Sequence, residues 1–178
     1  MSVKQIPMNE NRMKLAKEFA SAKFAETGVK NHFLDVFKIL QGEFNILDTD
    51  ILIAGILHDI LEDTSVTYEE MGEKFSKKVA DMVQEVSHPK NYTREQKDEY
   101  YQKIKTISSG AKLIKMADFT SHLRDFIKIY ERKEQHLYPK FVNNDKYIAS
   151  IREFLDSCED LTSKNIVYDL ANALEQLL

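Results

Sequence analysis

One segment of the sequence, ILIAGILHDILEDT at residues 51–64, joins an apolar run to a tight group of ionisable side chains. The apolar part is typical of a helix buried in a protein core. Four ionisable residues follow at once: His58, Asp59, Glu62 and Asp63. A buried carboxylate is costly unless it is paired, hydrogen-bonded or bound to a metal. The segment therefore predicts a central helix that carries a functional site.

Helical periodicity runs through most of the chain, and glycine and proline are scarce, with five and three residues. No stretch of useful length alternates between apolar and polar residues, as a half-buried strand would. The period predicts eight helical segments, at about residues 9–26, 31–42, 48–63, 66–87, 93–108, 110–133, 143–159 and 163–178. We therefore expect an all-α fold, with one domain over residues 1–178 that forms a bundle of about eight helices.

The charge balance restricts the class of partner. The net charge is -4 and the isoelectric point is about 5.8, whereas proteins that bind nucleic acid polymers are usually basic. A local basic pocket for a small phosphorylated ligand stays possible. The single cysteine, Cys158, cannot form an internal disulfide, and no apolar run is long enough to cross a membrane. These features favour a cytoplasmic protein and leave the oligomeric state open.

Two further polar residues lie in apolar surroundings. His32 stands near the start of the segment NHFLDVFKIL, and Asp118 interrupts AKLIKMADF. On a continuous helix, Glu62 would share a face with His58 and Asp59. So many acids require a positive charge nearby, and a divalent metal accepts imidazole and carboxylate ligands together. We therefore expect a central metal pocket, which His32, His58, Asp59 and Asp118 could form.

Each residue taken singly has an ordinary structural explanation. His32 could be a hydrogen-bonded core histidine, and Glu62 and Asp63 could form a solvated helix end. Asp118 could form an ion pair with Lys115 or Arg124. The order H…HD…D along one chain, with EDT directly after the HD pair, favours a metal site over four separate coincidences.

The same residues resemble those of the HD-domain phosphohydrolases. The segment AGILHDILEDTSVTYEEMGEKFSKKVADMVQEVS and the later SSGAKLIKMADFTSHLRDF resemble the hydrolase domain of RelA/SpoT-type proteins, and most of all the small stand-alone alarmone hydrolases. The resemblance is strongest over residues 32–129. It implies an all-helical fold, an Mn2+ site and removal of the 3′-pyrophosphate from guanosine tetra- or pentaphosphate. By position, the metal ligands would be His32, His58, Asp59 and Asp118, with Glu62 and Asp63 as the catalytic pair.

This chain departs from the family pattern in its nucleotide-binding positions. The basic loop before His32 is shortened, Phe33 replaces a proline, and His122 replaces an asparagine four residues after Asp118. The candidates for substrate binding are Lys23, Lys30, Lys112, Lys115, His122 and Arg124, with Lys90 and Arg94 in a later loop. Two alternatives therefore stay open. The protein could hydrolyse another phosphorylated nucleotide, or it could bind a nucleotide or metal without turnover.

Overall fold

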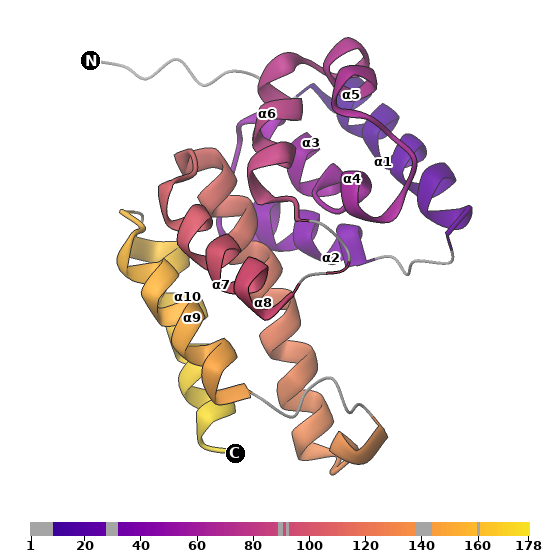
Figure 1. Ribbon diagram of the computed structural model, residues 1–178. Coiled ribbons are helices and arrows are strands. Elements are labelled where there is room, and N and C mark those ends of the chain that lie inside the picture. The colour runs from indigo at the N-terminus through magenta and orange to yellow at the C-terminus, as the bar shows by residue number, and fades with distance from the viewer. Residues whose placement is uncertain (1–8, 28–31, 89–90, 92, 138–143, 160) are drawn as a thin grey trace.

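The computed structural model describes residues 9–27, 32–88, 91, 93–137, 144–159 and 161–178. All regular elements in these ranges are helical, which confirms the all-α prediction (Figure 1). The α-helices are α1 (Glu10–Ala25), α2 (His32–Lys38), α3 (Thr49–Leu57), α4 (Ile60–Asp63), α5 (Tyr68–Lys74), α6 (Lys77–Val86), α7 (Arg94–Lys103), α8 (Ser109–Glu131), α9 (Asn144–Asp156) and α10 (Leu161–Glu175). Three short helical turns are η1 (Ile39–Glu43), η2 (Ile104–Thr106) and η3 (Gln135–Leu137).

Two of the expected helices are each divided in the structure. Residues 48–63 form α3 and α4 with a break at His58 and Asp59, and residues 66–87 form α5 and α6. Asp59 has φ -94° and ψ 0° and so leaves the helical conformation. At the second break, the Ser76 hydroxyl accepts a hydrogen bond from the backbone N–H of Val79, which begins α6 as a separate helix.

Helix α3 lies at the centre of the N-terminal half, where it contacts α1, α2, α6 and α8. Nearly all its side chains are buried, as the apolar run predicts. Gly55 allows η1, which continues directly from α2, to approach α3 closely, because a Cβ at this position would overlap the side chain of Leu40 in η1. Helix α2 also contacts α3, and this packing holds the start of α2 near the end of α3.

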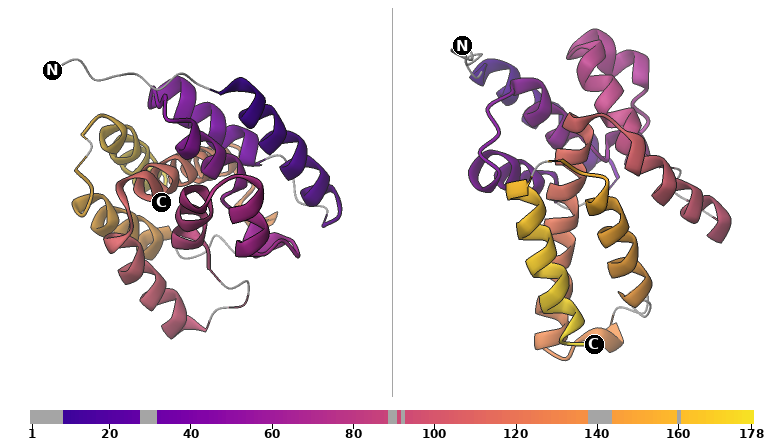
Figure 2. Two further views of the ribbon diagram at one scale, coloured as in Figure 1. Left: turned by 90° about the horizontal axis from the view of Figure 1, so that it is seen from above. Right: turned by 90° about the vertical axis from the view of Figure 1, so that its left-hand side faces the viewer.

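Helix α8 joins the N-terminal half of the structure to its C-terminal half (Figures 1 and 2). It packs against α3 and α6 on one side, and α10 runs beside it on another. The ring of Phe119 in α8 lies 5.5 Å from the ring of Phe154 in α9, so α9 also packs against the core. Asp118, next to Phe119, is therefore held in the buried middle of α8. Within the ranges that the structure describes, no helix is both long and apolar enough to cross a membrane.

Candidate metal centre and active site

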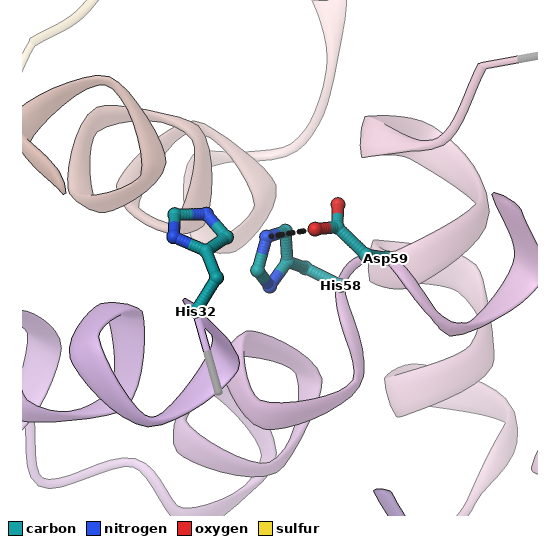
Figure 3. Close-up of side chains that lie close together, drawn as sticks. All are labelled: His32, His58 and Asp59. Atoms are coloured by element: carbon teal, nitrogen blue, oxygen red, sulfur yellow. Dashed lines mark ion pairs between the residues drawn. The ribbon is translucent and has the colours of Figure 1, made fainter. Parts of the chain in front are cut away.

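His58 lies at the break between α3 and α4 and is buried. His58 is 3% exposed, and its Nδ1 lies 2.9 Å from the carbonyl oxygen of Gly55, to which it can donate. Its Nε2 lies 3.1 Å from Oδ2 of Asp59 (Figure 3), yet among the described residues no group meets this nitrogen in hydrogen-bonding geometry. With Nδ1 protonated, the lone pair on Nε2 is available to a metal.

The break also corrects one expectation from the sequence. His58, Asp59 and Glu62 do not share the face of one continuous helix, because the backbone leaves the helical conformation at Asp59. The polar groups instead converge from separate elements. His32, the first residue of α2, turns its ring toward His58, with ring centroids 5.3 Å apart (Figure 3).

Helix α8 supplies the second carboxylate of the cluster. Asp118 is 4% exposed, and its Oδ1 lies 3.0 Å from Nε2 of His32 and 4.0 Å from Nε2 of His58. Its Oδ2 accepts a hydrogen bond from the buried ammonium of Lys115 at 2.8 Å. Burial by itself would raise the pKa of Asp118, but the charge of Lys115, together with the neighbouring histidines, outweighs it, and the pKa lies well below its usual range. Asp118 is therefore held as a carboxylate.

The arrangement fits a divalent metal. The ligand atoms of His32, His58 and Asp59 lie within 4.8 Å of one another, and so do those of His32, Asp118 and His122. The two triads share His32 and together offer imidazole nitrogens and carboxylate oxygens, the donors that divalent transition metals accept. The buried Nε2 of His58 makes no hydrogen bond within the described chain, and a metal ion would satisfy it. The structure thus brings the four predicted ligands together, and their role as ligands stays a prediction.

Glu62, on α4, lies beside this cluster and is held by a residue that the sequence did not indicate. Its Oε1 accepts a hydrogen bond from the backbone N–H of His88 at 3.0 Å, and its Oε2 lies 3.3 Å from Nε2 of His88. A histidine in a polar segment gives no periodic signal, so the sequence pattern alone does not indicate His88. Asp63, the other member of the predicted pair, ends α4 and is partly exposed.

The predicted substrate-binding residues are distributed unevenly. Lys115 and His122 both contact Asp118. Lys112 donates to the carbonyl oxygen of Ser157 at 2.6 Å, and Arg124 forms two hydrogen bonds with Glu43, at 2.6 and 2.7 Å. The charge of Arg124 is thus already neutralised. Lys112 and Arg124 are thus engaged by Ser157 and Glu43 rather than by Asp118.

Of the other predicted cations, Lys23 lies at the end of α1 and two fall outside the described residues. The ammonium of Lys23, in the last turn of α1, lies 3.9 Å from Oε1 of Glu26 and is partly exposed. Lys30 and Lys90 lie outside the described residues. Lys23 therefore stays a candidate for substrate binding, and the prediction for Lys30 falls outside the described residues.

A basic pocket lies between α7 and α9. It has a volume of about 570 Å³ and is lined by three cations, one acid and two tyrosines among its residues: Arg94, Lys97, Lys146, Asp98, Tyr101 and Tyr147. Only Arg94 was a candidate from the sequence. The ring of Tyr147 lies 6.0 Å from that of Phe119, the neighbour of Asp118. Burial raises the pKa of Tyr147 well above its usual value, and the charge of Asp118 adds to this effect.

We expect the metal-free protein to become less stable as the pH rises from about 6 to about 9. Burial lowers the pKa of His58, but the charges of Asp59 and Asp118 outweigh it and raise this pKa to about 9. Burial, followed by the charge of Asp59, raises the pKa of Glu62 to about 8. Both groups therefore bind a proton more tightly in the folded chain. Their contribution to the free energy of unfolding is complete below their ordinary values of 6.5 and 4.5, and is lost as the pH rises through about 9 and about 8.

Urea unfolding of chelator-treated protein at about pH 6 and about pH 9 measures this loss. In Glu62→Gln the loss should be smaller, because the amide does not titrate. Glu69→Gln, an exposed position on α5, provides the matched control and should behave as the unsubstituted chain does. A free energy of unfolding that stays level or increases over this pH range would show that these groups are not held as described.

Comparisons with known proteins identify relatives. A model of the HD domain matches residues 13–143 of the chain. The chain is 38% identical over 101 residues to guanosine-3′,5′-bis(diphosphate) 3′-pyrophosphohydrolase MESH1 of Drosophila melanogaster, covering 56% of each chain. It is 41% identical over 96 residues to the protein of the same name from Xenopus tropicalis, covering 53% of this chain and 54% of the other. The chain thus spans about half the length of the curated relatives it matches.

The fold also resembles a solved structure, described as "A metazoan ortholog of SpoT hydrolyzes ppGpp and plays a role in starvation responses". The TM-score is 0.76 at 24% sequence identity, and the match covers 97% of this chain and 100% of the other. At this level of identity the likeness concerns the fold. Because the match covers nearly the whole of both chains, the likeness in fold includes the C-terminal helices, where the sequence resemblance is faint.

Proposed function

This chain belongs to the HD-domain family, and we propose that it is a divalent-metal-dependent phosphohydrolase that removes the 3′-pyrophosphate from guanosine tetra- or pentaphosphate. The observation that carries the proposal is the buried Nε2 of His58, which makes no hydrogen bond among the described residues and faces a cluster of histidines and aspartates. The proposed ligands are His32, His58, Asp59 and Asp118. A divalent ion in such a centre supplies Lewis acidity, which makes hydroxide available near neutral pH and neutralises charge on a phosphate.

The chain's own groups would prepare the centre for this chemistry. The carbonyl oxygen of Gly55 fixes the tautomer of His58. Lys115 balances one of the two aspartate charges from its buried position beside Asp118. Glu62 has a pKa raised to about 8, by burial first and then by Asp59, so it can carry a proton at neutral pH. We propose that Glu62 donates this proton to the leaving oxygen and that Asp63 orients the attacking water.

The proposed substrate class rests on the relatives and on the basic pocket. The matched relatives from Drosophila melanogaster and Xenopus tropicalis carry the name of a guanosine-3′,5′-bis(diphosphate) 3′-pyrophosphohydrolase. In this chain, Arg94, Lys97 and Lys146 outnumber the single acid Asp98 at the pocket between α7 and α9. Lysine and arginine attract phosphate groups. An anionic nucleotide could therefore extend from the metal cluster toward this pocket, in a protein whose net charge is negative.

The finer identity of the ion and the location of the protein are also proposals. Mn2+ is the proposed ion because the family resemblance implies it, with another divalent metal as the alternative. A cytoplasmic location is proposed because the chain has a single cysteine, Cys158, which cannot form an internal disulfide.

Incubation of the purified chain with Mn2+ and a panel of phosphorylated nucleotides tests the proposed function. We expect release of pyrophosphate and guanosine diphosphate from guanosine tetraphosphate, measured by chromatography, and no release after chelation. The rate should fall as salt is added, because salt screens the attraction between the pocket and the phosphates. Hydrolysis of a different nucleotide alone would replace the substrate, and tight binding without turnover would favour a non-catalytic nucleotide sensor.

A further inference from the structure

His122 lies one turn after Asp118 on α8 and points toward the same oxygen as His32. Its Nδ1 lies 3.1 Å from Oδ1 of Asp118, and Nε2 of His32 lies 3.0 Å from that oxygen. Two imidazole nitrogens therefore converge on one carboxylate oxygen, and the three ligand atoms lie within 4.8 Å of one another. This spacing is short enough for one ion to contact all three.

The ring of His122 is held in this orientation by stacking. It lies nearly parallel to the ring of His32, with centroids 4.7 Å apart and an angle of 13°. The ring of Phe126 is also nearly parallel to it, at 6.3 Å and 14°. Because the side chain is still 44% exposed, an ion can reach His122 from solvent. The ring is thus both oriented and accessible.

A second, independent observation points to a ligand at the same place. The buried Nε2 of His58 has no hydrogen-bond partner within the described chain, and it lies 4.0 Å from the Asp118 oxygen that His122 faces. The triad of His32, His58 and Asp59 and the triad of His32, Asp118 and His122 therefore lie side by side and share His32. Together the two triads contain five donor side chains.

We propose that His122 is a fifth protein ligand of the metal centre, which then holds three imidazoles and two carboxylates. This inference rests on the metal centre of the proposed function and replaces the expectation that His122 binds substrate. Imidazole favours the later first-row metals, whereas a carboxylate-rich centre favours Mn2+. His122 therefore raises the preference of the centre for Zn2+ or Co2+ over Mn2+.

Pulsed electron paramagnetic resonance of the Mn2+-loaded protein, with histidine labelled by the heavy nitrogen isotope, counts the bound imidazoles. We expect three coupled nitrogens in the unsubstituted protein and two in His122→Asn. His136→Asn, an exposed position in η3, is the matched control and should keep all three. If His122 only donates a hydrogen bond to Asp118, the number of coupled nitrogens will not change, and the proposal is overturned.

Competition between Zn2+ and Mn2+ provides a second measurement that does not depend on activity. Loss of groups that merely orient a metal ligand weakens binding by about 10–100-fold, so loss of a direct imidazole should weaken Zn2+ binding at least ~10-fold and Mn2+ binding less. An unchanged affinity ratio in both His122→Asn and His122→Ala would overturn the role of His122 and leave the centre in place. Failure of the unsubstituted protein to bind either ion would overturn the metal centre itself.

Discussion

Replacement of His58 by alanine should leave the chain unable to bind a divalent metal and unable to hydrolyse a nucleotide. The substitution removes an imidazole nitrogen that is buried and makes no hydrogen bond within the described chain. The same nitrogen lies 3.1 Å from Oδ2 of Asp59 and 4.0 Å from Oδ1 of Asp118, so the two carboxylates lose a neighbouring ring. Metal analysis of the purified protein measures the first effect, and the nucleotide assay measures the second.

Thermal unfolding provides a third measurement of the predicted loss of metal binding in His58→Ala. A ligand at a hundredfold excess over its Kd raises the free energy of unfolding by ~2.7 kcal/mol, which corresponds to a Tm shift of roughly 5–10 °C in a domain of this size. The unsubstituted protein should show this shift when Mn2+ is added, and His58→Ala should show none. His136→Ala is the matched control and should respond fully.

Asp59→Asn tests the metal site without creating a cavity. It keeps the volume of the side chain and removes its charge, so metal affinity should fall while the metal-free protein still folds. A normal Tm response to Mn2+ in both His58→Ala and Asp59→Asn would exclude these residues as ligands and, with them, the proposed centre.

The positions of the predicted ligands followed from the sequence because each one interrupts an apolar run. His32 and Asp118 are polar residues in helices whose neighbours are buried, and burying such groups requires a compensating interaction. The sequence therefore indicates that each of the two side chains has a polar or metal partner, although His32 and Asp118 lie 86 positions apart. The geometry of their meeting depends on how α2 and α8 pack, which periodicity does not describe.

The break at Asp59 could not be predicted in the same way. The apolar pattern continues through Ile60 and Leu61, so the helical period alone favours one uninterrupted helix. In the structure, the break directs His58 and Asp59 toward His32 and Asp118. The backbone at Asp59 thus departs from the helix that the local sequence favours, as often happens where a functional site constrains the backbone.

The cations show the limit of reasoning from charge. Arg124 looked suited to bind phosphate because of its planar guanidinium, but its two hydrogen bonds go to Glu43, which lies 81 positions earlier. No spacing rule connects residues this far apart. The sequence does not indicate Lys97 or Lys146 either, because exposed lysines are common on helix surfaces. Only the relative positions of α7 and α9 in the fold bring these two lysines to one pocket.

Substitution of Glu62 by glutamine should reduce turnover strongly while the metal is retained. The glutamine side chain has nearly the same shape, and its amide oxygen can still accept the hydrogen bond that the backbone N–H of His88 donates at 3.0 Å. It cannot, however, transfer a proton. General acid–base groups typically contribute ~10²–10⁴-fold to a rate, so kcat should fall by about that factor, with little change in KM.

The comparison with two other variants makes this prediction specific. Asp63→Asn should also lower kcat, because the neighbouring carboxylate is proposed to orient the attacking water. Glu69→Gln makes the same chemical change as Glu62→Gln at an exposed position of α5 and should leave kcat unaltered. Metal content, measured on the same samples, separates loss of proton transfer from loss of the centre. Unchanged kcat in Glu62→Gln with metal bound would mean that its carboxyl group, despite a pKa raised to about 8 by burial and by Asp59, transfers no proton in the rate-limiting step.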